Sequence, residues 1–159
     1  SPPDSVPDSN VRNAMSQRLA SSTWVQFLLV LGGLNLLWEI AQLPFYTLWK
    51  EQSWPVIAYD VIHCTLGDFL IATLCSVVAL APFKWRWPGN RRQRLIFLAI
   101  FLTCGTGYTI YSEWLNTAVR KSWSYSELMP LVPPLGTGLT PLLQWLLLPV
   151  LSFWIVSRR

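Results

Sequence analysis

Apolar residues run through this chain in four long stretches, each interrupted by a few polar or ionisable side chains. The stretches cover residues 24–46, 56–81, 95–117 and 139–157. Each has roughly the twenty residues that a helix needs to cross a hydrocarbon core about 30 Å thick. The pattern predicts an all-α integral membrane protein, in which residues 23–159 form a bundle of four transmembrane helices.

Composition and the residues outside these stretches agree with a membrane protein. Of the 159 residues, 52% are hydrophobic and 13% are charged, against about 25% charged in a typical soluble domain. Residues 1–22 are rich in Pro, Ser and Asp and lack an apolar stripe, so we expect a mobile cytoplasmic N-terminal tail. The cysteines fall inside apolar stretches without paired spacing, which predicts buried free thiols rather than disulfides; they are Cys64, Cys75 and Cys104.

Lysine and arginine positions predict the orientation of the bundle. The twelve basic residues divide nine to three between the two ends of the predicted spans. The first end carries Arg12, Arg18, Lys84, Arg86, Arg91, Arg92, Arg94, Arg158 and Arg159, and the second carries Lys50, Arg120 and Lys121. Because cytoplasmic loops carry the excess of positive charge, both termini and the 82–94 loop should be cytoplasmic. The loops at 47–55 and 118–138 should face outward, and we expect the protein in a bacterial inner (plasma) membrane.

Ionisable side chains inside the apolar stretches are the candidates for chemistry. A charge at bilayer depth costs roughly 2.5–3.5 kcal/mol on insertion scales, so it persists only where partners or a water-filled cavity receive it. The four catalytic candidates are Glu39, Asp60, His63 and Glu113. At about 1.5 Å of rise per residue, all four fall in the outer half of their spans. We therefore expect a polar, periplasm-facing cavity there.

Spacing within each helix suggests how these groups work together. Acid and partner lie three residues apart, on one helix face, in the pairs Glu39–Gln42, Asp60–His63 and Glu113–Asn116. Glu39 and Glu113 are the candidates for a protonated acid and an ionised base, a division that proton-transfer catalysis requires. Asp60 would orient His63 by accepting one ring N–H. Substrate contacts are expected from Gln42, Asp68, Tyr111, Asn116, Gln144, Trp54 and Trp123.

Metal and nucleophile chemistry are less well supported. Carboxylate-bridged metal bundles use two helices that each carry Glu-x-x-His, whereas this chain has one histidine. A metal, if bound, would be held by His63 with Glu39 or Glu113. No glycine-rich serine elbow occurs near the histidine, which argues against a serine hydrolase. The sequence identifies no cofactor.

Backbone residues add three expectations. Pro44 should kink the first helix beside Glu39. The pairs Gly32-Gly33 and Gly105-x-Gly107 should mark close approaches between helices. The aromatic 118–138 loop is long for a helix connection, which leaves open a lid over the cavity or an interfacial aromatic belt.

These features favour a small intramembrane enzyme. It would use acid/base chemistry on an apolar, lipid or isoprenoid-like substrate, as an isomerase, hydrolase or transferase. One alternative is a subunit of a larger membrane complex whose polar cluster contacts a partner or cofactor. Another is a transporter or metal-handling protein, although the apolar inner half argues against a continuous polar path. We expect membrane lipids as partners, no nucleic acid, and either a homo-oligomer or a larger membrane complex.

Overall fold

Four long helices make up most of the structure, a computed structural model that describes residues 9–158 and the side chains from residue 23 onward. They are α1 (Ser9–Gln42), α3 (Trp54–Leu80), α4 (Arg91–Trp114) and α5 (Leu139–Ser157). Within the described part of the chain, four helical segments are long and apolar enough to cross a membrane: Thr23–Phe45, Trp54–Phe83, Arg91–Val119 and Leu139–Ser157. The prediction of a mostly helical protein with four helices long and apolar enough to span a membrane is therefore confirmed.

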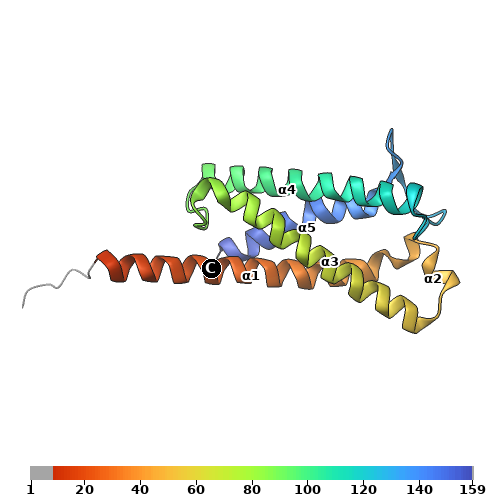
Figure 1. Cartoon of the computed structure of the whole chain (residues 1–159), viewed down its shortest axis with the longest axis horizontal. Coiled ribbons are helices and arrows are strands. Elements are labelled where there is room, and N and C mark those ends of the chain that lie inside the picture. Colours follow the sequence, from red (N-terminus) through yellow and green to blue (C-terminus); the bar gives the residue numbers. More distant parts are fainter. Residues whose placement is uncertain (1–8, 159) are drawn as a thin grey trace, which may run out of the picture.

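The helices form an up-and-down bundle (Figure 1). Each of α1 and α4 packs against both α3 and α5, so neighbours in the sequence are neighbours around the bundle. Figure 1 also shows that α3 runs obliquely and diverges from α4 toward the end of the bundle that carries α2 (Leu48–Glu51). The two helices are thus close at one end and apart at the other.

Aromatic side chains fill the end of the bundle where α3 and α4 are joined by the 81–90 segment. The Phe27 ring of α1 is 0% exposed, and its centroid lies 5.4–6.3 Å from those of Trp87, Phe97, Phe101 and Phe153. Tilted and edge-on pairs of this kind add to the gain from burying the rings. This end of the bundle is therefore a packed, largely apolar core, in which the buried hydroxyl groups of Ser76 and Ser152 donate to backbone carbonyls of their own helices.

Glycines allow close contact at two of the four predicted positions. A Cβ on Gly105 would overlap the Trp145 ring of α5, and a Cβ on Gly32 would lie 3.1 Å from the Phe69 ring. Around Gly33 and Gly107, by contrast, a Cβ would meet nothing within 4 Å. The first member of each pair therefore serves helix packing, and the second faces open space.

Proline ends α1 instead of bending it. The helix stops at Gln42, and Pro44 lies in the 3-10 turn η1 (Leu43–Phe45). The prediction of a kink at Pro44 is wrong, because a residue without an N–H can terminate a helix as readily as bend it. At its other end α1 begins at Ser9, so residues 9–22 of the expected tail are helical, while residues 1–8 lie outside the described residues.

Residues 120–138, here called the roof segment, fold back over the end of α1. The segment follows the π-helix η3 (Leu115–Val119) and contains strands β1 (Leu131–Val132) and β2 (Thr137–Gly138), which pair antiparallel. Tyr125 forms an isolated β-bridge with Tyr46. On either side of that bridge, Thr47 N–H donates to Ser124 O (3.0 Å) and Ser126 N–H donates to Phe45 O (2.9 Å). The roof segment is therefore tied to the residues that follow α1, from Phe45 of η1 to Thr47.

Candidate functional site

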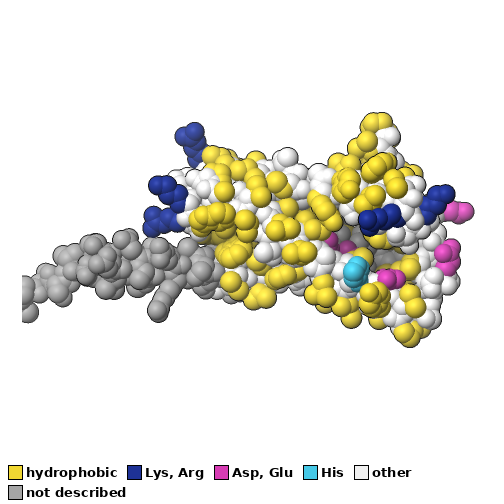
Figure 2. Space-filling model, viewed as in Figure 1, with side chains coloured by type: hydrophobic (Ala, Val, Ile, Leu, Met, Phe, Trp, Pro, Cys, Tyr) yellow, Lys and Arg dark blue, Asp and Glu magenta, His cyan; other side chains and the backbone are white. Residues whose placement is uncertain are grey.

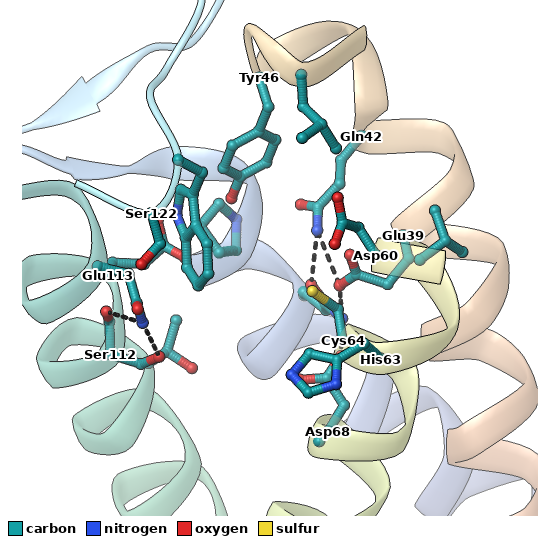
Figure 3. A pocket seen from close by; sticks show the side chains of 18 of the residues that line it. Glu39, Gln42, Tyr46, Asp60, His63, Cys64, Asp68, Ser112, Glu113 and Ser122 are labelled. Atoms are coloured by element: carbon teal, nitrogen blue, oxygen red, sulfur yellow. Dashed lines mark hydrogen bonds between the residues drawn. The ribbon is translucent and has the colours of Figure 1, made fainter. Parts of the chain in front are cut away.

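A cavity of about 570 Å³ lies inside the bundle at the roof end. Its lining comes from all four long helices and from the roof segment, with α4 forming one wall and α1 and α3 the other (Figure 3). Its volume falls within the range of about 300–1,000 Å³ that is usual for small-molecule sites. The polar lining residues are Glu39, Gln42, Tyr46, Tyr59, Asp60, His63, Cys64, Asp68, Tyr108, Thr109, Ser112, Glu113, Asn116, Arg120, Ser122, Trp123, Gln144 and Trp145.

A pair of carboxyl groups lies at the centre of the α1–α3 wall. The carboxyl groups of Glu39 and Asp68 lie beside each other, because both accept from the same nitrogen atom. The Gln144 amide of α5 donates to both, over 3.1 Å to Glu39 Oε1 and 2.8 Å to Asp68 Oδ2. Two ionised carboxylates so close together repel each other, and a proton on one of them relieves that repulsion. Sequence analysis predicts Glu113 as the partner of Glu39, whereas in the structure Asp68 lies beside Glu39.

Buried amides hold this pair in place. Gln42 Nε2 donates to Glu39 Oε1 over 2.9 Å and reaches Gln144 Oε1 at 3.4 Å. Asn35, which is 2% exposed, offers Oδ1 to Gln144 Nε2 at 3.4 Å. Sequence reasoning missed Asn35, although its position four residues before Glu39 puts both on one helix face. The Gln42 Oε1 atom has no hydrogen-bond partner, and the residue is 6% exposed.

Glu113 of α4 lies on the opposite wall of the cavity and contacts the roof segment. Its carboxylate accepts a short hydrogen bond from the Tyr125 hydroxyl, which in turn accepts from Gly138 N–H over 3.0 Å. The Trp123 indole N–H faces the same carboxylate in a contact too long or bent for a full hydrogen bond. Burial, followed by the bond to Glu113, raises the pKa of Tyr125 above its ordinary value. The carboxylate thus fastens the roof segment to α4.

Asp60 and His63 line the cavity near its mouth. His63 is exposed, and its ring stacks on Tyr59 with centroids 5.8 Å apart and planes 14° from parallel. Within the part of the chain that the structure describes, no hydrogen bond joins Asp60 to His63, because the imidazole lies over the tyrosine one turn away. Figure 2 shows a hollow on this face with the histidine at its rim.

Of the expected substrate contacts, five line the cavity: Gln42, Asp68, Asn116, Trp123 and Gln144. Tyr111 and Trp54 do not; they are 54% and 70% exposed on the outside of the bundle. Asn116 donates to Ser112 O at 2.9 Å and to Ser112 Oγ at 3.3 Å, which fixes its side chain along α4.

Several lining residues escaped sequence reasoning, among them Tyr46, Tyr59, Tyr108, Ser112 and Arg120. Tyr108 and Ser112 precede Asn116 by eight and four residues, which is a spacing that places them on the same face of α4. Arg120 comes from the roof segment, whose course no helical pattern predicts.

Metal ligation finds little support in this arrangement. Among residues 9–158, no three His, Cys, Asp or Glu side chains converge closely enough to hold an ion. Cys64, Cys75 and Cys104 are free, as expected, and Cys64 borders the cavity. The chemistry of the site therefore rests on carboxyl groups, amides, phenols and one imidazole.

The fold and the site define a class: an integral membrane protein with four spanning helices and a polar cavity between them. Comparison of the chain with models of protein families, with curated protein sequences and with solved structures gives no match. Its function is therefore inferred from the residues that line the cavity.

Proposed function

We propose that the protein is a small intramembrane enzyme that uses acid/base chemistry on an apolar substrate of the lipid or isoprenoid kind. The observation that carries the proposal is the carboxyl pair Glu39–Asp68, bridged by Gln144 in a cavity within the membrane-spanning segments. Helix–helix adhesion alone does not require such a pair, because neutral amides hold membrane helices together at lower desolvation cost.

The pair combines the two roles of proton-transfer catalysis. One carboxyl group with a proton acts as a general acid, and its ionised partner acts as a general base. Gln144, by donating to both, keeps the two groups together as the proton moves from one to the other. Glu113, on the facing wall of α4, is the third group placed to contact a substrate between the walls (Figure 3). Asp60 and His63 then contact the part of the substrate nearest the mouth.

The same proposal places the roof segment and the cavity on the outer side of a bacterial inner membrane. Support comes from the 82–94 segment at the opposite end of the bundle, where Lys84, Arg86, Arg91, Arg92 and Arg94 gather. Cytoplasmic loops are enriched in such residues.

Turnover of lipids by the purified protein tests the proposal. The protein is reconstituted in vesicles made from the total lipid extract of its source cells, and the lipids are followed by mass spectrometry. We expect one lipid class to be converted by the wild type and by Glu127→Gln, a control at an exposed roof position. Conversion by Glu39→Gln should fall about 100-fold or more, the usual contribution of general acid/base catalysis, with no change in thermal stability.

Two results count against the enzyme. Conversion of no lipid by the wild type, or equal conversion by all variants, overturns the proposal. Co-purification of the protein in a larger particle that Glu39→Gln disrupts would support instead a role as a subunit of a membrane complex.

A further inference from the structure

The cavity is bounded along the bundle axis at both ends. At one end the Trp145 ring packs against Gly105, and the aromatic core around Phe27 fills the space beyond it. At the other end the roof segment, whose Ser122 and Trp123 line the cavity, is held to Tyr46 through the Tyr46–Tyr125 bridge and to α4 through the Tyr125–Glu113 hydrogen bond.

The side of the bundle between α3 and α4 is different. The cavity there is bordered by residues whose other surfaces face outward, including Tyr59 of α3, 65% exposed, and Tyr108 of α4, 45% exposed. Gly67 of α3 also lines the cavity, and a Cβ at that position would meet nothing within 4 Å. This is the side of the bundle on which α3 diverges from α4 in Figure 1 and on which Figure 2 shows a hollow. Both helices belong to the segments that are long and apolar enough to span a membrane, so an opening between them offers a route from the bilayer.

Hydrogen bonding in the cavity leaves one buried acceptor and one buried donor without partners. The side-chain amide N–H groups of Gln42, Asn116 and Gln144 are all directed at oxygen atoms of the protein. The Gln42 Oε1 atom lacks a donor and the Trp123 indole N–H lacks an acceptor, and a buried polar atom without a partner is destabilising. A ligand that donates a hydrogen bond would satisfy the Gln42 oxygen, and a hydroxyl group would also accept from Trp123.

Charge in the cavity selects against anions. Four carboxyl groups line it, those of Glu39, Asp60, Asp68 and Glu113. Among the described lining residues, Arg120 is the single lysine or arginine. A phosphate head group would therefore meet an excess of negative charge, and like charges in a space of low dielectric repel strongly.

We infer that the cavity takes an amphiphile sideways from the bilayer, through the opening between α3 and α4. Its head group carries hydroxyl or amine donors and no negative charge, and its apolar chain extends past Gly67 into the lipid. Chemical conversion of the bound amphiphile rests on the proposed function, whereas its entry and binding do not depend on any turnover.

Photocrosslinking of lipids tests the inference. Wild-type protein in phosphatidylcholine vesicles is irradiated with one of three probes that carry a diazirine in the same acyl chain: a diacylglycerol, a long-chain amine or a phosphatidic acid. Adducts are mapped by mass spectrometry with and without excess unlabelled lipid. We expect the hydroxyl or the amine probe to mark the cavity-lining peptides around Gly67 and Ser112 in a way that unlabelled lipid suppresses. Phosphatidic acid should mark only the outer surfaces of the helices.

A matched pair of glycine variants locates the entrance. Gly67→Leu places a side chain in the opening, where its Cβ meets nothing within 4 Å, and its cavity adducts should fall about tenfold, as for a steric cost of ~1.4 kcal/mol. Gly107→Leu, at an exposed position of α4 that also has free space around it and does not line the cavity, should label like the wild type. Lateral entry would be overturned by adducts spread evenly over all lipid-facing surfaces, or by cavity adducts that are unchanged in Gly67→Leu. Cavity labelling by phosphatidic acid that equals that of the other probes would overturn the head-group assignment.

Failure of this inference and failure of the enzyme are distinguishable. Saturable cavity labelling without any lipid conversion supports the entrance and overturns the catalytic proposal. Glu39-dependent conversion that is equally fast in Gly67→Leu supports catalysis and overturns the entrance.

Discussion

Replacement of Gly105 by alanine tests the packing that forms the floor of the cavity. The added methyl group would overlap Trp145 Cε3 and lie 2.9 Å from Cζ3, on a ring that is only 4% exposed. A rigid indole cannot yield without moving α5, so the cost should be that of an overpacked core, about 1–3 kcal/mol. Alanine also gains up to about 1 kcal/mol over glycine in helix propensity, which would mask part of the effect.

Gly107→Ala removes that ambiguity. It lies on the same helix and makes the same chemical change, but its methyl group meets nothing within 4 Å. The propensity gain is then common to both variants, and their difference in unfolding free energy isolates the cost of the Trp145 contact. Unfolding by sodium dodecyl sulphate in mixed micelles is followed by tryptophan fluorescence. The unfolding free energy of Gly105→Ala should be about 1–3 kcal/mol lower than that of Gly107→Ala. Equal stabilities of the two variants would refute the close approach of α4 and α5.

Three further predictions concern the roof end of the bundle. In a background with alanine at the three native cysteine positions, a cysteine at Ser122 should react with an impermeant maleimide in intact cells and one at Gly89 should not; the reverse result would invert the orientation. Tyr125→Phe removes the donor to Glu113 and should lower the unfolding free energy by about 1–3 kcal/mol. Tyr46→Phe is the control, because the Tyr46 hydroxyl donates no hydrogen bond among the described side chains from residue 23 to 158, and it should change the unfolding free energy little. Equal losses in the two variants would contradict the contact between Tyr125 and Glu113. Because the pKa of Tyr125 is raised in the folded protein, its contribution to stability should be complete below about pH 10 and decline as the pH rises through the folded-state value. Denaturation curves of Tyr125→Phe should show a flatter alkaline decline, and an unchanged decline would count against the raised pKa.

The depth of the polar residues was predictable from the sequence, because the rise per residue along a spanning helix is nearly constant. Glu39, Asp60, His63 and Glu113, placed at one level by counting, all line one cavity. Rotation about each helix axis was not predictable, since helical periodicity tells which residues share a face but not which neighbour that face meets. Asp68, expected only as a substrate contact, is for this reason the partner of Glu39.

The roof illustrates a second limit. The bridge between Tyr46 and Tyr125 joins residues far apart in the sequence, and neither composition nor periodicity carries a signal for it. Aromatic content suggested either a lid or an interfacial belt, and only the tertiary hydrogen bonds to Phe45 and Thr47 bring the segment to the cavity, which Ser122 and Trp123 line.

The most direct test of the account is a double-mutant cycle on the carboxyl pair, measured as the rate of lipid conversion in vesicles. Groups that share one proton act as a unit, and losses within a unit do not multiply. Glu39→Gln and Asp68→Asn should each slow conversion about 100-fold, and the double variant should be no slower than either. Wild-type rates in the single variants, or a combined loss of about 10,000-fold as expected for two independent sites, would contradict a shared proton-transfer pair.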